Sequence, residues 1–242
     1  MKRIMFFVCA MLTWLCTDVT AKTLVVYYSY TGNCREIVTT LTSQIEADVL
    51  EIQPAEKGLK YEANGYALGT QLLNAIKANP NDASSYPAID PVTTTLSDYQ
   101  TIIIVTPLWW SQMAANMQTY LFNYGGQMAG KNIGLIVSSA SSGISGVVAD
   151  CKRLVPDGKY FSQNLWINHS NHSNRSTLIQ NWLTAINYHA ATGISEFKTT
   201  ATAPVRIYDL SGRQLVTEPS KGIYIKKGKK VILKSATNSH GD

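Results

Sequence analysis

The stretch that decides the fold is Ser29-Tyr30-Thr31-Gly32-Asn33-Cys34, which joins a continuous apolar run to a helical pattern. The run over residues 24–28 is apolar or aromatic at every position, as in a central parallel strand that is covered on both faces. Apolar residues after the stretch are spaced as one face of a helix: Ile37, Val38, Leu41 and Ile45. We therefore predict a buried strand, a short turn and a helix in direct succession.

A turn of this kind forms a site for an anion. The first N–H groups of a helix have no partner within the helix, and the helix dipole favours negative charge there. Gly32 allows a positive φ or a close approach of the backbone to a ligand, and Ser29 and Thr31 add hydroxyl donors. No lysine follows the glycine, so this is not the loop that binds nucleoside triphosphates. We expect a phosphate held by neutral donors; a tight turn without a ligand is the alternative.

Strand and helix patterns alternate along the rest of the chain. We predict strands at 48–52, 99–105, 133–137 and 165–167, and helices at 66–78, 113–124, 144–154 and 176–188. Alternation of this kind indicates a parallel sheet with right-handed crossovers. The predicted fold class is α/β, a doubly wound five-stranded parallel sheet of order 2-1-3-4-5.

Ligands of such sheets bind beyond the carboxyl ends of the strands, where the order reverses. The loops after the first, third and fourth strands are therefore expected to meet at one edge. The third strand leads into Thr106-Pro107-Leu108-Trp109-Trp110, and the fourth into the serine- and glycine-rich turn Ser139-Ala140-Ser141-Ser142-Gly143. Aromatic rings beside a phosphate loop suit a flat heterocycle with a phosphate tail, and stacking adds about 0.5–1.5 kcal/mol beyond area burial. Core packing or an exposed partner patch is the alternative for Trp109 and Trp110.

These motifs also carry a resemblance. Ser-x-Thr-Gly-Asn-Cys after an apolar strand resembles the FMN phosphate loop of flavodoxins, and Pro-x-Trp-Trp with the later Ser/Gly turn resembles a bacterial flavodoxin or NAD(P)H-quinone-reductase-related subgroup over residues 22–190. The resemblance implies FMN as the cofactor. It places Ser29, Tyr30, Thr31, Gly32, Asn33 and Cys34 at the phosphate, and Thr106, Pro107, Leu108, Trp109, Trp110, Ser139, Ala140, Ser141, Ser142 and Gly143 at the isoalloxazine ring.

The resemblance implies a redox function. We expect electron transfer, or quinone-reductase-type reduction, through bound FMN, with a redox partner or a small-molecule acceptor such as a quinone. No catalytic residue is assigned. Leu108 and Ala140 depart from the family pattern, which has a small polar residue and a glycine-rich histidine loop there. A flavodoxin-like domain that has lost FMN and acts as a binding module is therefore the alternative.

The first 21 residues have the pattern of a secretory signal peptide. Lys2 and Arg3 precede an apolar stretch over residues 4–16 that is too short for a stable membrane span, and Val19-Thr20-Ala21 is a small-residue cleavage site. We predict cleavage after Ala21, export to the periplasm or the exterior, and no stable membrane span afterwards.

The remaining chain divides by composition into residues 22–194 and a tail over residues 195–242. The tail alternates as strands at 205–213, 222–225 and 231–233, the last two joined by a basic turn. It resembles the C-terminal β tail that serves as a sorting signal on exported proteins of Bacteroidetes. A small β appendage of the main domain is the alternative.

The cysteines, the histidines and the charge distribution argue against a disulfide, a metal site and a nucleic-acid partner. Cys34 and Cys151 remain after cleavage, and their helices are expected on opposite faces of the sheet, too far apart for a disulfide. His169 and His172 have no third ligand in range, so we predict solvated loop histidines and no metal site. The formal charge of +5 comes largely from six lysines between Lys221 and Lys234, without an aromatic-interleaved basic stripe, so we expect no nucleic-acid partner.

Overall fold

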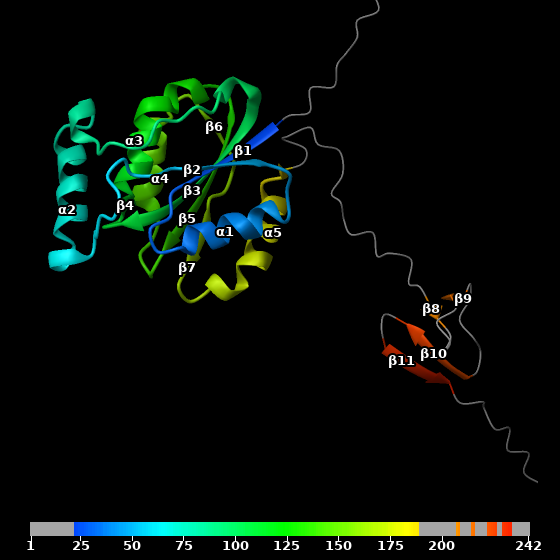
Figure 1. Ribbon diagram of the computed structural model, residues 1–242. Helices are drawn as coiled ribbons and strands as arrows, with labels where there is room; N and C mark the ends of the chain where they lie inside the picture. Colours follow the sequence, from blue (N-terminus) through cyan, green and yellow to red (C-terminus); the bar gives the residue numbers. More distant parts are fainter. Residues whose placement is uncertain (1–21, 189–206, 209–213, 216–221, 227–228, 234–242) are drawn as a thin grey trace, which may run out of the picture. The chain divides into compact units, whose positions relative to one another are not determined.

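The computed structural model describes residues 22–188 and four short segments near the C-terminus, at 207–208, 214–215, 222–226 and 229–233 (Figure 1). The chain divides into two compact units, Met1–Ile194 and Ser195–Asp242. The predicted signal peptide lies outside the described residues. None of the helices in the described part is long and apolar enough to cross a membrane.

The first unit contains a parallel sheet whose central strand, β3 (Tyr99–Trp109), lies between β1 (Lys22–Tyr27) and β5 (Asn132–Ser139) (Figure 1). Strand β2 (Asp48–Glu51) pairs with the outer edge of β1. The fifth position is shared by two pieces that both pair with β5: β6 (Lys159–Tyr160) and β7 (Leu165–Asn168). The predicted parallel order is thus confirmed, with β6 and the antiparallel strand β4 (Gln112–Met113) as additional short strands.

Two helical layers cover the sheet. Helices α1 (Asn33–Thr42) and α5 (Arg175–Ala185) pack on one face, and α2 (Ala63–Ala78), α3 (Ala115–Tyr124) and α4 (Ser145–Leu154) contribute to the core on the other (Figure 1). Residues 22–188 also form four short 3₁₀ helices: η1 (Ala83–Ser85), η2 (Leu96–Asp98), η3 (Gly125–Met128) and η4 (His172–Asn174).

The side chains of the apolar run in β1 alternate between the two layers. In β1, Leu24 and Val26 belong to the core on the α3–α4 side, and Val25 and Tyr27 to the core on the α1–α5 side. Period-two alternation with both faces covered explains why the sequence run contains no polar residue.

Two predicted boundaries were wrong on the side of the sheet where β3 ends. The third strand was expected to finish at Val105, but β3 continues to Trp109 and turns back into β4. The helix expected from Met113 therefore begins at Ala115. The helix predicted at 66–78 is confirmed: α2 spans Ala63–Ala78, but residues 64–66 are non-helical, so its regular backbone begins at Ala67.

The second unit contains an antiparallel sheet of order β11-β10-β8-β9. Its strands are β8 (Ile207–Tyr208), β9 (Gln214–Leu215), β10 (Gly222–Lys226) and β11 (Lys229–Leu233). The last two pair as the predicted hairpin, from Gly222 opposite Leu233 to Lys226 opposite Lys229. The rest of the strand predicted at 205–213 lies outside the described residues.

Cys34 and Cys151, the two cysteines among the described residues, are free and buried on opposite sides of the sheet, as predicted. Burial raises the pKa of the Cys34 thiol well above its usual range. Burial also raises the pKa of Cys151 to about 12. Both thiols are therefore protonated in the native state at physiological pH.

This burial predicts a loss of stability in alkali. Above pH 9, the ordinary value for these thiols, the unfolded chain releases protons that the native chain keeps, so the free energy of unfolding falls as the pH rises. Between pH 8 and pH 10, urea unfolding of residues 22–242 should show a loss about 1 kcal/mol larger than in Cys151→Ala. An identical pH dependence in the two chains would contradict the buried, protonated thiol.

Candidate functional site

The turn between β1 and α1 has the geometry of an anion-binding loop. Gly32 precedes the helix with φ 92° and ψ −22°, a left-handed conformation that glycine adopts without strain. The N-cap residue Gly32 has no side chain that could cap the helix, so the first turn depends on groups from outside the cap position. The Ser29 hydroxyl accepts the N–H of Arg35 at 3.2 Å, which leaves its own hydrogen available to a ligand. The predicted set of neutral donors is therefore present at a helix N-terminus.

The second wall of the site is the β3–β4 hairpin. Leu108 pairs with Met113 and Trp109 with Gln112, so the turn consists of Trp110 and Ser111 alone. Both have positive φ, 46° and 64°, the pattern of a type I′ turn. A loop was predicted at this position, but the structure has a two-residue hairpin turn. The sequence did not reveal it, because such turns are usually Asn-Gly or Asp-Gly, and Trp-Ser gives no such signal.

The two tryptophans of this hairpin differ in environment. The ring of Trp109 lies 4.7 Å from that of Tyr61 and 5.8 Å from that of Tyr28, centroid to centroid, and is partly buried. Trp110 is 44% exposed and meets Tyr66 edge to face at 5.8 Å. Both side chains line one cavity, and Trp109 also packs against the core on the α3–α4 side of the sheet.

Helix α2 provides the seat for Trp110. A Cβ on Gly69 would lie 2.7 Å from Cη2 of Trp110, so the indole rests directly on the helix backbone. Tyr66 is itself at φ 65°, within the left-handed segment at residues 64–66. Tyr66 and Trp110 therefore both have left-handed backbone, a conformation that costs of order 1–3 kcal/mol of folding free energy per residue.

The third wall follows β5. Ser139 and Ala140 line the cavity, and the Ser139 hydroxyl accepts the indole N–H of Trp166 at 2.8 Å and donates to the Ser142 carbonyl at 3.0 Å. Ser141, Ser142 and Gly143 are exposed and lie outside the wall.

A fourth wall, which the sequence analysis missed, comes from the loop between β7 and α5. Its cavity-lining residues are Asn168, His169, His172, Ser173 and Arg175. Arg175 pairs with the carboxylate of Glu36 in the first turn of α1 at 3.3 Å, and Nδ1 of His172 lies 4.0 Å from the same carboxylate. The prediction of solvated loop histidines holds for His169, which is exposed, but the His172 side chain is only 20% exposed; both line the cavity. Because β7 is parallel to β5, the same rule that located the other three loops also applies to this one.

Together these walls enclose an open cavity of about 1050 Å³. Of the predicted site residues, it contains Ser29, Tyr30, Thr31, Asn33, Cys34, Pro107, Leu108, Trp109, Trp110, Ser139 and Ala140. Gly32 shapes the loop from a neighbouring surface hollow, and Thr106 is fully buried, with its hydroxyl donating to the Pro107 carbonyl. Other lining residues that the sequence did not reveal are Glu36, Tyr61, Glu62, Tyr66 and Ser138.

One polar pair closes the cavity rim between α2 and the phosphate loop. The Tyr30 hydroxyl donates to the Glu62 carboxylate, and this hydrogen bond lowers the pKa of Glu62. The Tyr30 ring packs edge to face on Tyr61 at 5.0 Å. The rim is thus a continuous aromatic surface running from the phosphate loop to the hairpin.

A family model described as flavodoxin matches residues 22–186. The chain belongs to the flavodoxin family. A protein from Bacteroides uniformis ATCC 8492, provisionally described as a flavoprotein, is 23% identical, with a TM-score of 0.53 over 66% of this chain and 98% of that one. A flavoprotein from Lactobacillus acidophilus NCFM, solved in complex with FMN, is 20% identical, with a TM-score of 0.51 over 64% of this chain and 99% of that one. These likenesses confirm the predicted flavodoxin-like α/β fold.

The contact between α2 and the hairpin gives a prediction about Trp110. In Gly69→Ala the new methyl group displaces the indole, because the atom in its way is the far end of a side chain rather than backbone. We expect altered tryptophan near-ultraviolet circular dichroism with a loss of unfolding free energy of about 1 kcal/mol or less. Gly126→Ala, which has open space around it, is the matched control. Identical spectra for Gly69→Ala and wild type would contradict this seat.

Proposed function

We propose that this chain binds FMN in the cavity and acts as a redox protein, transferring electrons to a protein partner or reducing a small-molecule acceptor such as a quinone. The observation that carries the proposal is the meeting of a phosphate-type loop, an aromatic hairpin and a serine-rich turn around one cavity of about 1050 Å³. Membership of the flavodoxin family supports it. When bound, the flavin would supply the electron or hydride chemistry, and the protein would supply binding and orientation.

The residues present fit the two ends of FMN. At the phosphate end, the N-terminus of α1 behind Gly32 and the hydroxyls of Ser29 and Thr31 offer neutral donors. Glu36 would repel the phosphate, but the Arg175 guanidinium lies 3.3 Å from its carboxylate and offsets that charge.

At the ring end, the aromatic and backbone groups fit a planar heterocycle. Trp109 and Trp110 offer apolar ring surface, and Ser139 and Ala140 line the same cavity. Burial keeps the Cys34 thiol neutral, so its place in the phosphate loop adds no negative charge. The exposed part of Trp110 leaves the rim open to an electron donor or acceptor.

Two substitutions test the placement of FMN. Thr31→Ala should weaken FMN binding about tenfold and leave riboflavin binding unchanged, because it removes a donor to the phosphate only. Trp110→Ala should weaken both ligands about tenfold, because it removes ring contact. Isothermal titration of residues 22–242 measures all four affinities, and Thr39→Ala on the same helix is the control.

The outcome separates the two functions considered for this chain. Wild-type chain that shows no measurable affinity for FMN favours a binding module that has lost the flavin. Binding that is insensitive to both substitutions would mean that the flavin occupies another surface.

We further propose that the protein is exported after cleavage behind Ala21. The family match begins at Lys22, the residue that follows the predicted cleavage site, which supports a leader distinct from the domain. N-terminal sequencing of the protein recovered from the periplasm or medium of the expressing cell should begin at Lys22. Protein confined to the cytoplasm with residues 1–21 intact would contradict this proposal.

A further inference from the structure

The β3–β4 hairpin is held from behind by one face of α4. Gly146, Asp150 and Arg153 are four and then three residues apart, which places them on a single side of the helix. A Cβ on Gly146 would lie 2.0 Å from the carbonyl oxygen of Ser111, so the turn backbone touches the helix backbone at this point. One turn later, the Asp150 carboxylate accepts the N–H of Met113 at 3.0 Å.

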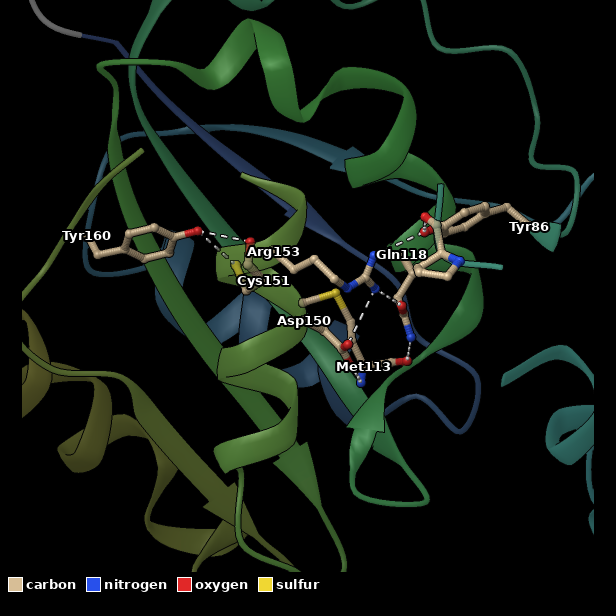
Figure 2. Close-up of polar contacts among 8 residues, drawn as sticks. Tyr86, Met113, Gln118, Asp150, Cys151, Arg153 and Tyr160 are labelled. Atoms are coloured by element: carbon tan, nitrogen blue, oxygen red, sulfur yellow. Dashed lines mark hydrogen bonds and ion pairs between the residues drawn. The ribbon is translucent and has the colours of Figure 1, made fainter. Parts of the chain in front are cut away.

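The same network holds the other backbone group of Met113 (Figure 2). The Gln118 amide donates to the Met113 carbonyl at 2.8 Å, and its own oxygen accepts from the Arg153 guanidinium at 2.8 Å. Arg153 also donates to the Tyr86 hydroxyl at 3.1 Å and lies 3.4 Å from the second carboxylate oxygen of Asp150. The Gln118 side chain is fully buried and that of Asp150 is 15% exposed, so these bonds are shielded from water.

The hairpin needs this support. Strand β4 has only two residues, and a hairpin of two pairs is not stable alone. Its turn places Trp110 and Ser111 at positive φ, a conformation that persists only where the surroundings fix it. The bond from Asp150 to the Met113 N–H fixes the returning strand immediately after this strained turn.

We propose that Asp150 is a positioning residue of the cofactor site, which sets the orientation of Trp110 by holding the Met113 N–H on α4. Asp150 itself does not line the cavity. Its effect passes through the hairpin backbone to the aromatic wall. The use of FMN as a probe rests on the proposed function, but the orientation of Trp110 is measurable without a ligand.

A matched control lies on the opposite side of the same helix (Figure 2). The Tyr160 hydroxyl is 2.9 Å from the carbonyls of both Cys151 and Val155, at the C-terminal end of α4. Tyr160→Phe removes hydrogen bonds to α4 without touching the hairpin. It should lower stability while leaving the aromatic wall in place.

The experiment compares Asp150→Ala, Asp150→Asn and Tyr160→Phe in the chain 22–242. The readouts are FMN affinity and the near-ultraviolet circular dichroism of the ligand-free chain, in which the Trp109 and Trp110 rings are 6.4 Å apart and cross at 87°. Asp150→Ala should weaken FMN binding about tenfold and move the spectrum toward that of Trp110→Phe. Asp150→Asn should restore both to within about twofold, because the amide oxygen still accepts the Met113 N–H.

Several results would overturn the inference. Wild-type spectrum and affinity in Asp150→Ala would do so, as would equal damage in Asp150→Asn or in Tyr160→Phe. If Asp150→Ala does not fold, Asp150→Leu replaces it, because leucine is close to aspartate in size and cannot accept the Met113 N–H, so it should change the tryptophan spectrum in the same direction. If the wild-type chain binds no FMN, the proposed function fails, and the ligand-free spectra alone decide the role of Asp150.

Discussion

Backbone pairing of β3 with β1 on one side and β5 on the other is the constraint on which the cavity depends. The parallel register runs from Thr23 opposite Thr101 to Tyr27 opposite Val105, and β5 continues to pair as far as Pro107 opposite Ser138. Parallel strands in fixed register end at the same edge of a sheet. The phosphate-type loop, the aromatic hairpin and the serine turn therefore share one edge because of backbone hydrogen bonds, independently of any ligand.

Buried apolar runs made the sheet predictable. The stretch 101–105 in β3 is almost entirely apolar, so both of its faces must be buried. Helices α1 and α5 cover one face of the sheet, and the core on the α3–α4 side covers the other. The turn that contains Gly32 was also predictable, because few residues other than glycine accept φ near 92°. Local chemistry and tertiary packing agree at these positions, and there the sequence is informative.

Elsewhere the structure depends on contacts that local sequence does not encode. A Trp-Ser turn at positive φ contradicts local preference, and it exists because Gly146 and Asp150, far along the chain, hold it from α4. Likewise, His172 was predicted to be solvated because its neighbours are polar, but the pairing of β7 with β5 brings its loop to the cavity. The rim from Tyr61 to Tyr66 was unreadable because three consecutive residues of α2 leave the helical conformation.

The left-handed backbone at Trp110 lowers the stability of the fold, whereas the side chain at the same position forms part of the cavity wall. Asparagine or glycine at this position would relieve the turn, and either change would commonly raise thermal stability by a modest amount. The same exchange would delete the exposed ring of the aromatic wall. A directed-evolution campaign that selected this chain for heat resistance alone would therefore tend to erase its ligand-facing surface, and a useful library would hold position 110 constant.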